Sequence, residues 1–271
     1  MTQIERKITL LAHTQLSAEF QHTLRLDGDA EIYQRYLRDD ISDGQAVALT
    51  AIRTCYSPGK PSEIVAKEGA RYFGKKATDG GKGTDADRLI RMIQSSGHTS
   101  TLEHLSYTFA VEGVSRALLA QLTRHRVGFS FSVQSQRYVK FGSDDRSGGF
   151  DYVVPDTVKA KDSPFAELDY GGTTTHYDSG AELFEEAILH AQHFYDKLRS
   201  IGVPAEDCRA VLPNAAACNL VLTVNLRALL DFYAKRKAGR GAQSEIAGLA
   251  EDLRKAVETV EPWTSQLFEA V

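Results

Sequence analysis

Residues 97–126 read GHTSTLEHLSYTFAVEGVSRALLAQLTRHR, and this stretch decides the fold. From Leu105 to Val111 apolar and polar residues alternate with the period of a half-buried β-strand. From Val114 to Arg126 apolar residues recur at the spacing of an amphipathic helix. The stretch therefore predicts a strand followed directly by a helix, with the polar run Arg124-His125-Arg126 at the C-terminal end of that helix.

Further helices are expected on both sides of this unit. A helix over Asp85–Ser96 is indicated by the capping residues Thr84 and Asp85 at its start and by Gly97 as its stop. Beyond the unit, the pattern predicts helices over Glu182–Ile201, from Pro204 onward, over Leu226–Lys237 and over Gln243–Phe268 with an interruption at Pro262, and a short strand over Val221–Val224. Because strands and helices do not alternate regularly, the sequence predicts an α+β fold with a mixed or antiparallel sheet flanked by helices.

Two stretches rich in glycine, proline and small polar residues interrupt the pattern, at 57–83 and 142–180. We interpret them as loop insertions and not as domain linkers, because the segments on either side carry short motifs that need each other. A length of 271 residues fits one large domain or two small ones. The prediction is a single domain over residues 1–271 with two long loops.

The composition is that of an ordinary globular protein, with 42% hydrophobic and 25% charged residues and a formal net charge of -4. A balance this close to neutral disfavours a general binder of nucleic-acid polymers or membrane surfaces. No apolar run approaches the ~20 residues that cross a bilayer, and the start has no signal-peptide stretch, so a cytoplasmic location is expected. Cys55, Cys208 and Cys218 show no CxxC spacing, which disfavours a disulfide framework or a thiolate zinc site.

The densest polar cluster is Arg124-His125-Arg126 together with the segment VGFSFSVQSQRYVKF that follows it. Cations at a helix C-terminus complement the helix dipole, so this triplet alone has a structural explanation. The continuation adds hydroxyls, amides and another guanidinium, at Ser130, Ser132, Gln134, Ser135, Gln136 and Arg137. Guanidinium groups bind phosphate bidentately, and amides and hydroxyls recognise nucleobase edges. A nucleotide site and an alternating strand with a solvated face both fit these residues.

Two further clusters carry polar residues inside apolar sequence. His98 and His104 flank Glu103 in a spacing that matches no zinc motif, so no metal is expected, and His98 either makes a structural hydrogen bond or lies beside a cofactor. In the C-terminal half, Arg236 and Arg240 are spaced to share one helix face and to converge on an anion. Neither GxGxxG nor GxxxxGK[ST] is present, so any flavin or nucleotide is held in another way.

Taken together, the blocks resemble the flavin-dependent thymidylate synthases. The resemblance is carried by GHTSTLEHLSYTFAVEGVSRALLAQLTRHR, by SFSVQSQRYVKF, by EDCRAVLPNAAACNLVLTVNLRALLDFYAKR followed by AQSEI, and by the earlier AIRTCYSP. These blocks span most of the chain outside the two loops. The sequence departs from the family spacing by one additional residue between Arg126 and Ser135 and by another after Arg236.

The resemblance implies reductive methylation of dUMP to dTMP, with methylenetetrahydrofolate as carbon donor, FAD as hydride carrier and NADPH as reductant. It assigns dUMP to Gln121, Arg124, Ser135, Gln136, Arg137, Arg209 and Arg236. It assigns FAD to His98, Ser100, Arg124, His125, Arg126, Asn225, Arg227 and Asp231, with His98 also near the folate. Arg236 takes the catalytic role, because a fixed guanidinium stabilises negative charge at the N3–O4 edge of uracil without acting as a nucleophile.

The family's sites lie between subunits, so the resemblance also implies a homotetramer with shared active sites. Two alternatives stay open at this point. The first is an enzyme of the same fold that methylates another uracil nucleotide, such as UMP. The second is a non-catalytic nucleotide-binding relative in which the two additional residues have disrupted the site.

Overall fold

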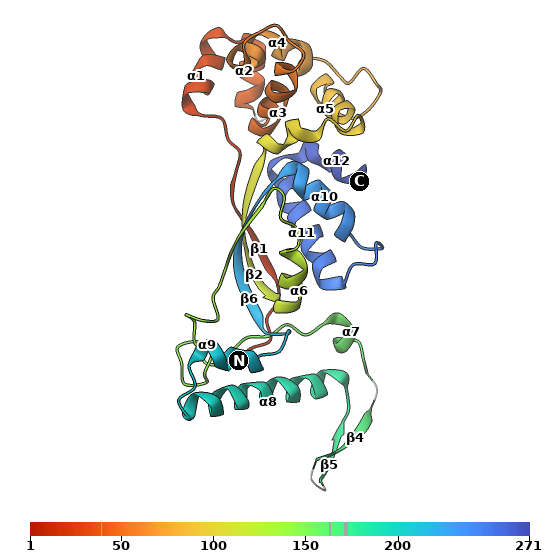
Figure 1. The fold of residues 1–271 in the computed structure, drawn as a ribbon. Helices are drawn as coiled ribbons and strands as arrows, with labels where there is room; N and C mark the ends of the chain where they lie inside the picture. The colour runs from red at the N-terminus through yellow and green to blue at the C-terminus, as the bar shows by residue number, and fades with distance from the viewer. Residues whose placement is uncertain (39, 163, 171–172) are drawn as a thin grey trace.

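The computed structural model of the chain describes residues 1–38, 40–162, 164–170 and 173–271. The molecule is elongated, with a helical end, a central sheet and a long helix at the opposite end (Figure 1). The helical end is built mainly from the N-terminal half of the chain and contains α1 (Ala18–Asp27), α2 (Ala30–Leu37), α3 (Asp43–Thr54), η1 (Pro61–Glu63), α4 (Ile64–Tyr72), α5 (Asp85–Ser95) and η2 (Thr99–His104).

The sheet has four antiparallel strands in the order β1-β2-β6-β3, which are β1 (Lys7–His13), β2 (Ser106–Ser115), β6 (Ala217–Asn225) and β3 (Phe129–Val133). In the central pair Phe109 lies opposite Leu222, and the side chains of both are fully buried. Helices α6 (Arg116–Leu122), α10 (Leu226–Arg236) and α11 (Ser244–Val260) lie along the sheet on one side (Figure 1). The predicted α+β class with an antiparallel sheet is confirmed.

The predicted helix over 114–126 is wrong at both ends. Strand β2 continues to Ser115 through a bulge at Gly113, where φ is 69° and a Cβ would lie 2.6 Å from the carbonyl oxygen of Glu5. The hydroxyl of Ser115 then caps α6 by accepting from the N–H of Leu118. Because α6 ends at Leu122, residues 124–126 lie in the turn after the helix and not on it.

The other predicted elements lie close to their expected positions. Helix α5 starts after a capping box formed by Thr84, and Gly97 has a φ of 77° just after its end. Strand β6 is longer than the predicted 221–224, and the last predicted helix breaks at Pro262 as expected. The remaining C-terminal elements are α8 (Gly180–Ser200), α9 (Ala205–Cys208), η3 (Arg209–Val211), η4 (Pro262–Thr264) and α12 (Ser265–Glu269).

The two predicted loops contain regular structure. Residues 61–72 form η1 and α4, and Ile64, Val65 and Tyr72 are buried, so the expectation of a loop is wrong there. The second stretch includes α7 (Asp156–Lys159) and a hairpin of β4 (Phe165–Tyr170) and β5 (Thr173–Tyr177), while residues 163, 171 and 172 lie outside the described residues. The glycine and proline clusters correctly predicted breaks in the pattern, but the short helix α4 that lies between them was not predicted.

A second, smaller hydrophobic cluster packs against α8. Phe150 and Tyr152, from the second predicted loop, pack there with Ile188 and Tyr195 of α8. Cys208 is buried in this cluster and Cys218 in the main core, whereas Cys55 is exposed; all three are free. Burial raises the pKa of Cys218 to about 11, which keeps its thiol protonated near neutral pH. No helix in the described part of the chain is long and apolar enough to cross a bilayer.

Candidate active site

Arg124, His125 and Arg126 occupy the turn between α6 and β3, which we call the RHR turn. The turn is docked against the start of α10, because the carbonyl of Gly128 accepts from the backbone N–H of Asn225 at 3.1 Å. A Cβ on Gly128, which has a φ of 74°, would lie 2.6 Å from Cβ of Ala228 and 2.7 Å from the Asn225 amide nitrogen. Only glycine fits this close approach.

Asn225 is the residue that joins β6 to α10. Its side-chain oxygen accepts from the backbone N–H of Ala228 at 2.9 Å and so caps the helix. A side chain that the sequence assigned to the flavin site therefore also has a structural role. The cap fixes where α10 begins, and Arg236 is the last residue of this helix. The cap therefore helps to place Arg236 beside the RHR turn.

Arg236, the last residue of α10, meets the RHR turn through His125. Its Nε donates to Nε2 of His125 at 3.2 Å. The imidazole packs edge-on against Phe232 at a centroid distance of 4.9 Å. Since Nε2 accepts a hydrogen bond, the imidazole is neutral and carries its hydrogen on Nδ1. Burial, followed by the positive charge of Arg236, lowers the pKa of His125, which favours this neutral form.

The guanidinium groups of the RHR turn keep their positive charge available. Arg124 and Arg126 are exposed, and within the described ranges neither forms an ion pair with a carboxylate. Two other arginines of the predicted site are paired, since Arg137 contacts Glu206 and Arg227 contacts Glu103. Unpaired guanidiniums on an exposed turn suit the diphosphate of a dinucleotide. The donor set at this turn therefore fits FAD.

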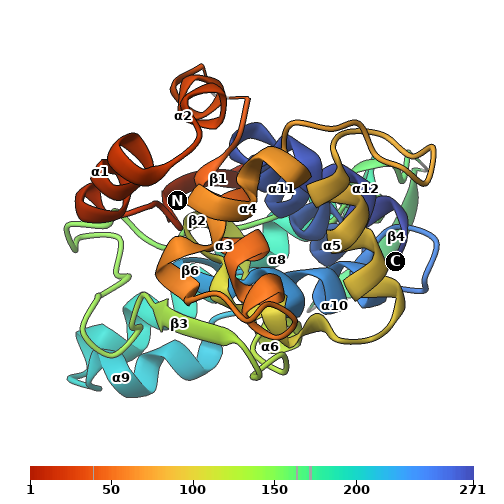
Figure 2. The same ribbon diagram turned by 90° about the horizontal axis from the view of Figure 1, so that it is seen from above.

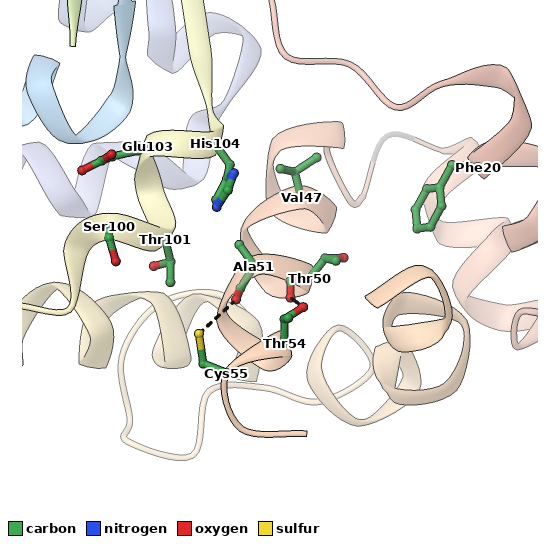
Figure 3. A pocket seen from close by; sticks show the side chains of 10 residues that line it. All are labelled: Phe20, Val47, Thr50, Ala51, Thr54, Cys55, Ser100, Thr101, Glu103 and His104. Atoms are coloured by element: carbon green, nitrogen blue, oxygen red, sulfur yellow. Dashed lines mark hydrogen bonds between the residues drawn. The ribbon is translucent and has the colours of Figure 1, made fainter. Parts of the chain in front are cut away.

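A cavity of about 870 Å³ lies between α3 and η2. Figure 3 shows four residues of η2 on one side of it and residues of α3 beside them; the lining consists of Phe20, Val47, Thr50, Ala51, Thr54, Cys55, Ser100, Thr101, Glu103 and His104. The hydroxyls of Thr50 and Thr54 donate to backbone carbonyls within α3, at 2.8 and 2.7 Å. These two side chains therefore offer only methyl groups and acceptor lone pairs to the cavity.

Ser100 of η2 was predicted from the sequence, whereas the wall that α3 provides was not. The block AIRTCYSP contained part of that wall, since Ala51, Thr54 and Cys55 come from it. The spacing of Val47, Ala51 and Thr54 along one helix face was the signal that would have revealed the rest. At the rim of the cavity, Glu103 contacts Arg227 of α10, which brings the η2 and α10 residues of the predicted flavin site together.

The second group of predicted residues gathers around α9 and is called the α9 cluster: Ser135, Gln136, Arg137 and Arg209. Gln136 is buried, and Oγ of Ser135 accepts from the backbone N–H of Arg137 at 3.2 Å. The guanidinium of Arg137 pairs with Glu206 of α9 at 2.5 Å and lies 5.6 Å from the ring centroid of Tyr138. Arg209 is exposed at the start of η3, directly after α9.

The structure separates these two groups within one chain. The RHR turn precedes β3 and the α9 cluster follows it, and the five residues of β3 span about 13 Å along the strand. The start of β3 packs against α10, where the rings of Phe129 and Phe232 lie 5.8 Å apart, whereas α9 and α10 lie well apart in both views (Figure 1 and Figure 2). Residues that the sequence assigned to a single dUMP, such as Arg236 and Arg137, therefore lie in separate places on the chain.

Three further predicted residues lie on or beside α10 and α6. Gln121 of α6 contacts the side chain of Gln243 at 2.5 Å, and Asp231 is exposed on α10, where it pairs with Lys235 at 2.7 Å. The expectation that Arg236 and Arg240 share a helix face is wrong, because α10 ends at Arg236. Glycines at 239 and 241 with φ of 82° and 74° then turn the chain away from the helix.

The fold is shared with solved structures. The chain is similar to the UMP/dUMP methylase PolB from Streptomyces cacaoi, bound with 5-Br dUMP, with a TM-score of 0.64 and 22% identity over 99% of this chain and 97% of that chain. The same enzyme bound with 5-Br UMP is similar over 98% of this chain and 94% of that chain, with a TM-score of 0.64. The chain therefore shares the fold of that enzyme.

Comparison of sequences identifies the family. Residues 36–263 match the family described as thymidylate synthase complementing protein. The flavin-dependent thymidylate synthase of Geobacter sulfurreducens is 37% identical over 220 residues, covering 81% of this chain and 80% of that protein. The one of Clostridium tetani is 33% identical over 234 residues, covering 80% and 79%. The chain belongs to the flavin-dependent thymidylate synthase family, and the resemblance seen in the sequence is confirmed.

Proposed function

We propose that the chain catalyses the reductive methylation of dUMP to dTMP, with methylenetetrahydrofolate as carbon donor, FAD as hydride carrier and NADPH as reductant. One observation carries the proposal beyond family membership: Arg236 is held by a neutral imidazole at 3.2 Å and not by a carboxylate. A guanidinium fixed in this way retains its charge for a substrate. The unpaired arginines of the RHR turn and the arginines of the α9 cluster supply the remaining positive charge that a nucleotide and a dinucleotide require.

The chemical role of Arg236 follows from this arrangement. Attack at the pyrimidine ring places negative charge on the N3–O4 edge of uracil, and donors already aimed at that edge stabilise it without reorganising. His125 uses one donor of Arg236 and leaves the remaining N–H groups available. A carboxylate partner would cancel part of the positive charge, whereas a neutral histidine orients the guanidinium and leaves its charge intact.

The flavin site is proposed to combine the RHR turn with η2. Bound FAD supplies the hydride transfer that the side chains of the protein do not perform. Arg124 and Arg126 are proposed to hold the diphosphate, and Ser100 lines the neighbouring cavity. Arg227, held by Glu103, is proposed to fix the position of η2 relative to α10 at this site.

The enzyme is proposed to act as a homotetramer in which each active site takes groups from different chains. Separation of the RHR turn from the α9 cluster supports this arrangement, because a single nucleotide meets both groups only if they come from neighbouring subunits. In a symmetric assembly, each chain then contributes its RHR turn to one site and its α9 cluster to another.

Absorption spectroscopy of the purified protein tests the proposal most simply. The expected result is a flavin spectrum that bleaches under NADPH, recovers when dUMP and methylenetetrahydrofolate are added, and is accompanied by formation of dTMP. A colourless protein that neither binds added FAD nor forms dTMP would contradict the proposal. dUMP binding without reoxidation of the flavin would instead identify a non-catalytic nucleotide-binding relative.

A second candidate function is methylation of UMP. It is favoured by the likeness of the fold to an enzyme described as a UMP/dUMP methylase. Turnover of dUMP and UMP measured side by side under identical conditions separates the two candidates. The proposal above expects a clear preference for dUMP, and an equal or greater kcat/KM for UMP would favour the second candidate.

A further inference from the structure

The hydroxyl of Tyr56 forms a hydrogen bond with one ring nitrogen of His98. Its Oη lies 2.9 Å from Nδ1 of His98, and the two rings meet edge to face with centroids 6.1 Å apart and an interplanar angle of 87°. Tyr56 follows α3 and His98 precedes η2, so the contact joins positions 42 residues apart. Their chain neighbours Cys55 and Ser100 both line the cavity between these helices (Figure 3).

A purely structural explanation of this contact is weak. The attachment of α3 to η2 already rests on Leu49, Ile52 and Leu102, whose side chains are fully buried in the main core. Tyr56 is 58% exposed and therefore buries little apolar surface. A hydrogen bond between partly exposed groups adds little to stability compared with the burial of three aliphatic side chains. The specific effect of the Tyr56 hydroxyl is on the imidazole.

The hydrogen bond determines which nitrogen of His98 is free for a ligand. In the part of the chain that the structure describes, Nε2 of His98 makes no hydrogen bond. A phenol is a stronger donor than acceptor, so Tyr56 donates to Nδ1 and the neutral imidazole carries its hydrogen on Nε2. The backbone is held too, because the carbonyl of His98 accepts from Oγ1 of Thr101 at 3.4 Å.

We propose that Tyr56 is a positioning residue that fixes the tautomer and direction of His98, so that Nε2–H donates to a carbonyl of the folate ring system. This inference rests on the proposed function and on the place beside flavin and folate that the family resemblance implies for His98. Tyr56 itself contacts the histidine and not the ligand. The hydrogen bond prepares the donor before the co-substrate arrives, which reduces the cost of ordering it on binding.

The adjoining cavity has the chemistry of a site for an uncharged heteroaromatic ring. None of its ten lining residues is a lysine or an arginine, so it offers no cation to a phosphate. Thr50 and Thr54 present acceptors and methyl groups, because their hydroxyl hydrogens are used within α3. Among the substrates of the proposed reaction, folate is the one without a phosphate and with ring N–H groups that such acceptors bind.

The variant Tyr56→Phe tests the inference, because it removes the hydroxyl and keeps the ring. We expect KM for methylenetetrahydrofolate to rise about 3–10-fold, the effect of one hydrogen bond, with FAD content and KM for dUMP unchanged. In ¹⁵N spectra, the Nδ1 resonance of His98 should move toward its solvent-exposed value. Tyr233→Phe is the matched control, because it removes a tyrosine hydroxyl of α10 that donates to Glu251 of α11 at 3.1 Å. This variant should change neither KM for the folate nor the His98 resonance.

A double-mutant cycle separates positioning from a direct role. In a His98→Gln background, Tyr56→Phe should cause no further rise in KM for the folate, because its effect passes through the histidine. An additional rise in that background would overturn the inference. So would an unchanged His98 resonance in Tyr56→Phe, or an equal weakening of all ligands together with a lowered Tm. The spectrum does not depend on turnover, so a shifted resonance in an inactive protein would refute the proposed function alone.

Discussion

Arg236, beside the RHR turn, and Arg137, in the α9 cluster, are held by opposite kinds of partner. Arg236 donates to the neutral imidazole of His125, and the nearby Arg124 and Arg126 have no carboxylate partner among the residues that the structure describes. In the α9 cluster, Arg137 is paired with Glu206 at 2.5 Å. The first arrangement keeps full positive charge for a reacting group. The second is an exposed ion pair, so a phosphate must compete with the carboxylate of Glu206 for the guanidinium of Arg137. This arrangement suits binding more than catalysis.

The largest expected effect comes from Arg236→Ala. Because the fixed guanidinium stabilises charge that develops only during the reaction, we expect kcat to fall by about 100-fold or more while FAD stays bound. Lys235→Ala is the matched control; it breaks the exposed ion pair with Asp231 and should change kcat little. Steady-state kinetics and the flavin content of the purified variants provide the measurement. Turnover of Arg236→Ala close to that of the native protein would show that Arg236 is not catalytic.

The next largest effect tests whether the α9 cluster binds the phosphate of dUMP. We expect Arg137→Ala to weaken dUMP binding by about tenfold or more, because a charged hydrogen bond to phosphate is lost. Glu206→Gln should instead tighten dUMP binding a few-fold, since it frees the same guanidinium from its partner. Titration calorimetry with dUMP measures both. If Glu206→Gln weakened binding as much as Arg137→Ala, the carboxylate would be part of the binding geometry and not a competitor.

A smaller effect concerns the pH dependence of the RHR turn. The pKa of His125 is lowered by burial and by Arg236, so the stability that its neutral form contributes is present above about 6.5 and is lost as pH falls through the lowered pKa. Protonated His125 cannot accept from Arg236, and a several-fold decline of kcat should accompany the loss. His125→Gln should flatten both the kcat and the Tm profiles in this range. Stability that rises toward acid pH would contradict the assignment.

The smallest effect is expected at Ser135. Its hydroxyl accepts from the backbone N–H of Arg137 and is proposed to orient the nucleotide. Ser135→Ala should raise KM for dUMP by roughly 2–10-fold, the range of a single hydrogen bond, and leave kcat nearly intact. Complete inactivity combined with normal dUMP affinity would show that the serine acts in the chemical step, which would place chemistry in the α9 cluster.

The sequence predicted the fold where the apolar period was long and clearly bounded. Helices α5 and α8 lie where capping residues and helical spacing placed them, and Pro262 interrupts the last helix. Around Val114 the prediction failed, because the same apolar residues satisfy a strand and a helix. The strand continues through a bulge at Gly113, which lies close to the backbone carbonyl of Glu5, a neighbour that the local sequence does not reveal.

Residues of the candidate site could be proposed from the sequence, but their arrangement could not. Motif spacing identified His125 and Arg236, yet the hydrogen bond between them joins positions 111 residues apart and depends on how α10 packs against the RHR turn. Tyr56 lies within the block AIRTCYSP, but the block assigns it no role, because that role depends on its contact with His98, 42 residues away. Which guanidiniums are neutralised likewise follows from tertiary neighbours, such as Glu206, and not from local sequence.

One active site is proposed to take the RHR turn and Arg236 from one chain and the α9 cluster from another, and mixing two inactive variants tests this sharing. Arg236→Ala and Arg209→Ala, each nearly inactive alone, are dissociated together, reassembled in equal amounts and assayed for dTMP formation. Random assembly should restore about a quarter of native activity, because mixed pairs regain one intact site. A mixture that stays inactive while native mass spectrometry shows mixed oligomers would contradict the shared site.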